Sequence, residues 1–129
     1  MREMNKQRPV HLALHEIRLP LAGFASILHR VSGAGLFLML PLLIWLLQLS
    51  LDANSAALFS SVMGNWFVKL ILLGLLWAFL HHFCMGIRIL LIDIHVGVEK
   101  EQARSSAMAV MVVSLALTTI FGLKLLGAY

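Results

Sequence analysis

The sequence predicts an all-α membrane protein that forms one domain over residues 1–129, and three observations support this prediction. Hydrophobic residues make up 60% of the chain and charged residues 12%, whereas soluble domains are roughly half apolar and about a quarter charged. The mean hydropathy is +0.92. Three long runs are almost free of charge, and each is long enough to cross a bilayer core of about 30 Å as a helix. We therefore expect three transmembrane helices.

The N-terminal segment, residues 1–20, is polar and mixed in charge, with Pro9 and Pro20 as helix breakers. A short helix at about Leu12 to Arg18 would lie at the membrane surface rather than cross the membrane. The net charge of +4 does not predict a nucleic-acid-binding protein, because the basic residues are not clustered with interleaved aromatic residues.

The first predicted span covers residues 21–51, and its part from Val31 to Leu51 contains no charged residue. Pro41 should kink this helix, because proline lacks the backbone donor that a helix interior needs. Residues 52–65 are predicted to form a polar loop. The second and third spans cover residues 66–92 and 105–124, and a mixed-charge connection joins them.

The basic residues predict the orientation, since cytoplasmic loops carry the excess of Lys and Arg. Eight of the ten basic residues fall on one side of the predicted membrane, and only Lys69 and Lys124 fall on the other. The N-terminus should therefore be cytoplasmic and the C-terminus should lie outside. The eight residues are Arg2, Lys6, Arg8, Arg18, Arg30, Arg88, Lys100 and Arg104.

Two adjacent histidines near the middle of the second span are the first candidates for function, because ionisable groups inside a membrane are costly. At about 100° per residue, His81 and His82 face different neighbours. His82 shares its face with Ala78 and Gly86, which would leave room for a porphyrin or would simply let two helices approach. Metal or haem ligation, interhelical hydrogen bonding and proton relay all remain open for this residue. Trp77 and Arg88 lie on the face of His81, which suits packing or a hydrogen bond to another helix.

Haem ligation would set a constraint on partners. His11, His15 and His29 precede the charge-free first run and His95 follows the second span, so a second histidine ligand would have to come from another chain. The single cysteine, Cys84, gives no motif for covalent haem attachment.

Ser26 and Arg30 form the second candidate site. They are four residues apart, so they share one face if the helix begins early. A hydroxyl and a guanidinium at the membrane edge can bind a carbonyl ligand or an acidic group. Alternatively, Arg30 anchors the helix at the headgroups and Ser26 caps a turn.

Two separated motifs also carry a resemblance. The first comprises Arg8-Pro9-Val10, Leu14 and the run Ser-Ile-Leu-His-Arg-Val-Ser-Gly from Ser26 to Gly33. The second, from His82 to Arg88 with Asp93 downstream, follows the pattern H-x-x-x-G-x-R. Together they resemble the cytochrome b556 membrane-anchor subunit of bacterial succinate dehydrogenase, over essentially the whole chain.

The resemblance implies one of two anchors in the heteromeric helical bundle of succinate:ubiquinone oxidoreductase (respiratory complex II). The complex would lie in the bacterial inner membrane, with the C-terminus of this chain in the periplasm. The partners would be a second membrane-anchor subunit, an iron-sulfur subunit and a flavoprotein subunit. The chain itself would carry out no succinate chemistry. An anchor of a quinol:fumarate reductase and a haem-free structural or assembly subunit are the alternatives.

The resemblance also implies roles for individual residues. His82 would be an axial ligand of the iron of haem b, and the companion anchor would supply the other ligand. Ser26 and Arg30 would lie in the ubiquinone pocket, and His29 and Arg30 would lie near the haem propionates. Asp93 is a candidate for a proton path to the quinone, whereas His95 is expected in a solvated loop.

Overall fold

The computed structural model describes residues 13–127. Within that range the regular elements are all helical, five α-helices and two short 3-10 helices, so the all-α prediction is confirmed. Several residues named above precede the described range, and nothing is concluded about their structure. They are Arg2, Lys6, Arg8, Pro9, Val10, His11 and Leu12.

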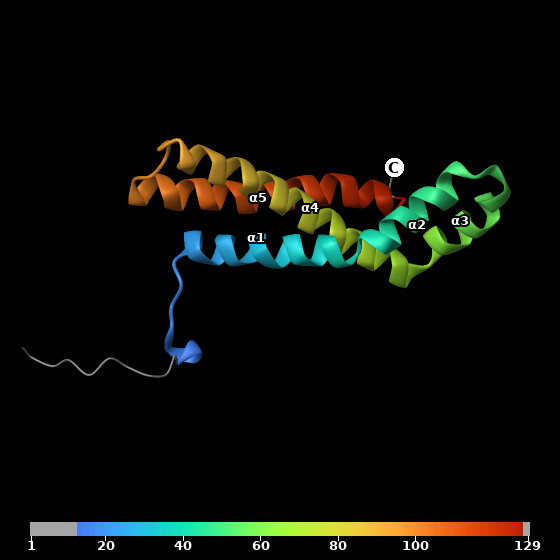
Figure 1. Cartoon of the computed structure of the whole chain (residues 1–129), viewed down its shortest axis with the longest axis horizontal. Coiled ribbons are helices and arrows are strands. Elements are labelled where there is room, and N and C mark those ends of the chain that lie inside the picture. Colours follow the sequence, from blue (N-terminus) through green and yellow to red (C-terminus); the bar gives the residue numbers. More distant parts are fainter. Residues whose placement is uncertain (1–12, 128–129) are drawn as a thin grey trace, which may run out of the picture.

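Three helices form the bundle: α1 (Leu21–Leu38), α4 (Trp66–Asp93) and α5 (Lys100–Leu125). Each is long and apolar enough to cross a membrane, and the predicted number of three spans is therefore confirmed for the described residues. Helix α4 runs antiparallel to both α1 and α5, as Figure 1 shows. The start of α1, the end of α4 and the start of α5 consequently gather at one end of the bundle.

The core of the bundle is small. Its buried apolar residues are Ala25, Met85, Ala107 and Val110, contributed by all three spanning helices. Alanine at these positions allows close approach of the helix backbones. Many large apolar side chains remain exposed on the outside, which suits contact with lipid or with helices of another subunit.

The first predicted span is wrong in its extent. Helix α1 ends at Leu38, Met39 breaks the helix, and α2 (Leu40–Leu51) follows with Pro41 in its first turn. A continuous helix would place the proline ring against the carbonyl of Phe37, so a new helix begins instead. The sequence predicted a kink at Pro41, and the structure shows a break.

The predicted loop at residues 52–65 is also largely wrong. It contains η2 (Ala53–Ser55) and α3 (Ala56–Gly64), and α3 is bent by 104° relative to α2. Asp52 begins this turn by accepting hydrogen bonds from the Ser55 hydroxyl at 2.6 Å and the Asn54 backbone at 3.0 Å. The same bonds hold the pKa of Asp52 below its ordinary value. The pair α2 and α3 extends the far end of the bundle (Figure 1).

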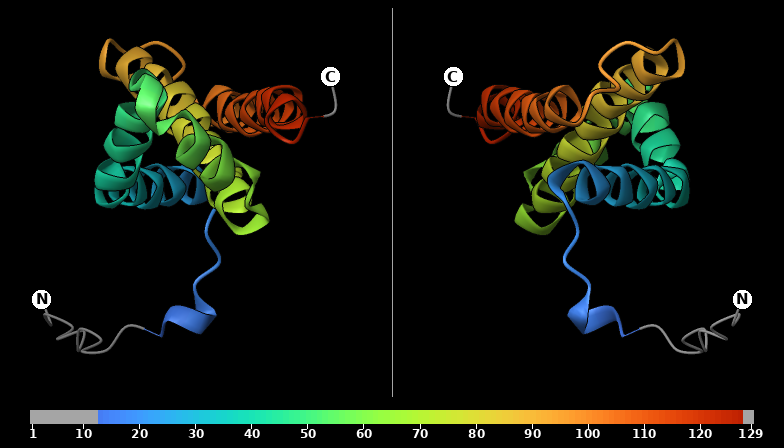
Figure 2. Two further views of the ribbon diagram at one scale, coloured as in Figure 1. Left: turned by 90° about the vertical axis from the view of Figure 1, so that its right-hand side faces the viewer. Right: turned by 90° about the vertical axis from the view of Figure 1, so that its left-hand side faces the viewer.

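The segment before α1 leads away from the bundle, as the views in Figure 2 show. From residue 13 to Pro20, its regular structure is the single 3-10 turn η1 (Leu14–Glu16). This turn lies within the predicted surface helix, although it is shorter than expected. Helix α1 then begins directly after Pro20, whose φ of −65° suits the start of a helix.

Candidate functional site

His82 of α4 lies against α1. Its Nδ1 atom is 3.0 Å from the carbonyl oxygen of His29 and 3.3 Å from the hydroxyl of Ser32. Because a carbonyl oxygen only accepts, the contact with His29 assigns the proton of the neutral ring to Nδ1 and leaves the lone pair on Nε2. No hydrogen bond to Nε2 is made by the described residues. A ring held in this way presents one free nitrogen in a defined direction.

The imidazoles of His29 and His82 are stacked, with ring centroids 4.1 Å apart and an angle of 10° between the planes. His29 precedes the charge-free run at Val31 but lies inside α1, which begins at Leu21, so a second histidine of this chain does reach the depth of His82. Rings that lie face to face do not point their nitrogens at each other across a metal. In this arrangement, His29 is not positioned as the opposite ligand of an ion bound by His82.

One glycine makes this helix contact possible, and a second borders it. A Cβ atom at Gly33 would lie 2.7 Å from Cε1 of His82, so no other residue fits there without moving the ring. A Cβ atom at Gly86 would lie 4.0 Å from Nε2 of His29. The His29 ring therefore borders the face of α4 that carries Gly86 and His82.

His81 is fully buried, with 0% of its surface exposed. Its Nε2 atom is 3.4 Å from the carbonyl oxygen of Ala25, and its ring stacks on Trp77 with centroids 5.3 Å apart. The predicted role of His81, packing with a hydrogen bond to a neighbouring helix, is confirmed. Nδ1 of His81 and Nε1 of Trp77 are buried and have no hydrogen-bond partner among the described residues.

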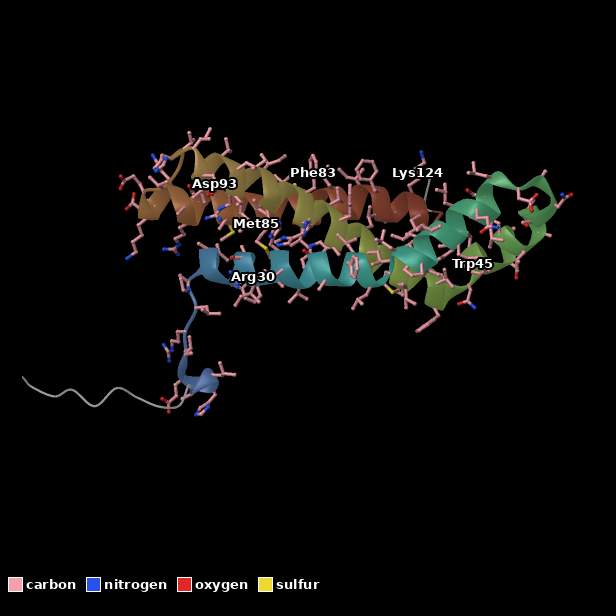
Figure 3. The ribbon with its side chains drawn as sticks, viewed as in Figure 1. Arg30, Trp45, Phe83, Met85, Asp93 and Lys124 are labelled. Atoms are coloured by element: carbon pink, nitrogen blue, oxygen red, sulfur yellow. The ribbon has the colours of Figure 1, made fainter. Side chains whose placement is uncertain are left out.

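Ser26 and Arg30 both lie on α1, one turn apart, as the sequence predicted. Ser26 is half-buried and Arg30 is exposed. Neither side chain forms a hydrogen bond or an ion pair with the described residues, so their polar groups are available to a ligand. Figure 3 shows Arg30 at the same level along the bundle as Met85. Met85 follows His82 by three residues, about one turn of α4.

Arg88 has a structural role that the sequence did not predict. It is 8% exposed and joins α4 to α5: Nε donates to the Ser106 hydroxyl at 2.9 Å and Nη2 donates to the Ala103 carbonyl at 3.0 Å. Nη1 lies 3.9 Å from the sulfur of Met85. A signal was present in the sequence, because an arginine inside a span must find internal acceptors.

Asp93 and His95 lie beyond this site, at the end of α4. Asp93 is the last residue of the helix and is exposed, and Figure 3 shows it near the end of the bundle where α1 begins. His95 adopts a φ of +63° in the exposed connection to α5, so its expected place in a loop is confirmed. A hollow of about 470 Å³ opens between the starts of α1 and α5 and is lined by Pro20, Leu21, Ala22, Lys100, Ala103 and Arg104.

Comparison with known proteins assigns the chain to a family. The family model described as succinate dehydrogenase/fumarate reductase transmembrane subunit matches residues 4–121. The chain is 34% identical to the succinate dehydrogenase cytochrome b556 subunit of Paracoccus denitrificans, over 93% of this chain and 94% of that protein. It is 35% identical to the subunit of the same name from Coxiella burnetii, over 92% and 97% of the two chains. The chain belongs to the family of succinate dehydrogenase and fumarate reductase transmembrane subunits.

Proposed function

We propose that this chain is the haem b-containing membrane anchor of a succinate:ubiquinone oxidoreductase, in which it anchors the catalytic subunits and forms part of the ubiquinone-reduction site. The single observation that carries the proposal is the contact between His82 Nδ1 and the His29 carbonyl. Histidines that ligate metals almost always donate their other ring nitrogen to a carbonyl, a carboxylate or water.

His82 fits a haem ligand for three reasons. Its Nδ1 proton is held by a backbone oxygen, its Nε2 lone pair is free of the described residues, and its ring is locked between His29 and Gly33. His29 and Arg30 are the residues of this chain that would meet the haem propionates. The second axial ligand would come from the companion anchor. When bound, haem b supplies a one-electron redox centre whose potential depends on ligands and burial.

Ubiquinone is the substrate of the proposed site. The Ser26 hydroxyl and the Arg30 guanidinium are unpaired within the described chain and lie on one face of α1. Both can donate hydrogen bonds to a quinone carbonyl oxygen. They would hold and polarise that oxygen while electrons arrive from the iron-sulfur subunit, and Asp93 would help to supply protons. Succinate oxidation itself would belong to the flavoprotein subunit.

The proposed orientation places this site on the cytoplasmic side of a bacterial inner membrane. The charge distribution described above favours a cytoplasmic N-terminus and a periplasmic C-terminus. His82 precedes Asp93 by eleven residues, or ~16 Å along a helix. Haem and quinone sites would therefore share the half of the membrane that faces the catalytic subunits. The family also includes fumarate reductase subunits, so the reverse reaction, from quinol to fumarate, is the second candidate.

The test is the ubiquinone reductase activity of the purified complex with Arg30→Leu. We expect reduction of ubiquinone by succinate to fall, because the guanidinium no longer binds the quinone oxygen. Reduction of a water-soluble artificial acceptor by succinate should be unchanged. The control is Lys124→Leu, which removes an exposed cation at the opposite end of the bundle. An equal loss of both activities would indicate failed assembly, and an unchanged ubiquinone activity would exclude Arg30 from the site.

A further inference from the structure

Consecutive histidines of α4 contact successive turns of α1. His81 Nε2 lies 3.4 Å from the Ala25 carbonyl, and His82 Nδ1 lies 3.0 Å from the His29 carbonyl. The two carbonyls are four residues apart and therefore lie one above the other along α1. The turn between them contains Ser26, and Arg30 follows it directly.

The His81 contact is the one nearer to the start of α1. No side chain caps that end of the helix, and the preceding segment leads away from the bundle (Figure 2). The start of α1 is therefore held from the side, by apolar packing of Leu21, Ala22 and Ala25 and by the hydrogen bond to His81. Apolar packing is non-directional. A hydrogen bond is directional, so the bond to His81 restrains the rotation of the start of α1 about its own axis.

The surroundings of His81 favour a directional role over simple space filling. The ring is fully buried between helices, yet Nδ1 has no partner among the described residues. Only one of the two ring nitrogens therefore forms a hydrogen bond within the described chain. Since Ala25 supplies an acceptor, Nε2 carries the proton of the neutral ring. An apolar side chain of similar size would fill the same volume without leaving a polar atom unpaired.

The geometry points to His81 as a positioning residue for the quinone site. Its Nε2–H bond to the Ala25 carbonyl sets the rotation of the first turns of α1 and thereby the direction in which Ser26 and Arg30 present their donors. This inference rests on the proposed function of Ser26 and Arg30. In this role His81 would act through α1 and would touch neither the quinone nor the haem. Its loss should weaken quinone binding and leave haem and the catalytic subunits intact.

The test compares His81→Phe with His81→Gln in the purified complex. Phenylalanine keeps the flat ring and removes the donor, so the KM for ubiquinone should rise roughly three- to tenfold, the value of one hydrogen bond. The kcat, the reduced b-type absorption and the artificial-acceptor activity should stay unchanged. Glutamine places an amide donor near the position of Nε2 and should restore most of the affinity. An unchanged KM in His81→Phe would overturn the inference.

Two further variants keep the test decisive. Trp77→Phe retains an aromatic neighbour for His81 and removes an N–H that has no partner, so its KM should equal that of the wild type. A rise as large as that of His81→Phe would assign the effect to packing and overturn the inference.

If His81→Phe does not assemble, His81→Asn replaces it. Its shorter amide cannot reach Ala25, and a KM equal to that of His81→Gln would contradict the proposal.

The two sets of variants distinguish the quinone site from the positioning role of His81. If Arg30→Leu raises the KM and His81→Phe does not, the quinone site stands and the positioning role is wrong. If neither variant changes the KM, the site assigned to Ser26 and Arg30 is itself wrong.

Discussion

The imidazole of His29 lies face to face with the imidazole of His82, with centroids 4.1 Å apart. The two residues are 53 positions apart in the sequence, and each is held at the crossing of α1 and α4. A glycine on each helix, Gly33 and Gly86, borders the opposite ring. The helix crossing and the proposed ligand are thus parts of one packed unit.

Gly33→Ala should disturb this unit. The new Cβ would lie 2.7 Å from Cε1 of His82, so the ring must move from its bond with the His29 carbonyl. Overpacking of this kind destabilises by about 1–3 kcal/mol. We expect a lower melting temperature of the complex and a weaker or shifted reduced b-type absorption.

Gly35→Ala is the matched control, because a Cβ atom at Gly35 meets nothing within 4 Å. Both substitutions change helix propensity equally, so the difference between them measures the clash. Identical spectra and melting temperatures for the two variants would show that His82 is not confined by Gly33.

Arg88→Lys should loosen the contact between α4 and α5. The guanidinium donates to Ser106 and Ala103 at once, and a lysine ammonium cannot reproduce that fork. Hydrogen bonds from charged groups contribute about 1.5–3 kcal/mol each, so the melting temperature of the purified complex should fall clearly. Arg104→Lys, at an exposed position of α5, should have little effect. Equal melting temperatures for both variants would argue against this role.

Asp93→Asn should slow ubiquinone reduction without changing the KM. The reduction consumes two protons for each quinone, and Asp93 is an acidic group at the end of α4, at the end of the bundle where α1 begins (Figure 3). A loss of kcat of about tenfold or more is expected if this carboxylate carries protons. Glu99→Gln, an exposed acid in the next connection, serves as the control. Matching kcat values in the two variants would remove Asp93 from the proton path.

The long second and third spans could be predicted because each is a continuous apolar run, and a run of that length in a membrane forms a helix. The different environments of His81 and His82 could also be predicted, since helical periodicity alone separates their faces. The orientation of each ring could not. It depends on carbonyl oxygens of α1, which carry no signal in the sequence.

The first span is predicted correctly at its start and wrongly at its end. The predicted start at residue 21 agrees with α1, which begins directly after Pro20. Its end was extended across Pro41, where the chain instead starts α2. The serines of residues 52–65 suggested a loop, yet the Ala, Leu, Phe and Met residues among them form α3.

The role of Arg88 depends on tertiary contacts. Its partners are a backbone carbonyl and a serine on α5, and neither stands out in the sequence. Periodicity could place Arg88 on the buried face of α4, but it could not say which helix lies opposite.

The most direct test of the central claim is the dithionite-reduced absorption spectrum of the purified complex with His82→Ala. The proposed ligation predicts that the reduced b-type absorption is lost or strongly reduced in this variant. Succinate oxidation by an artificial acceptor should persist, which shows that the complex has assembled. A reduced b-type absorption equal to that of the wild-type complex would contradict ligation by His82.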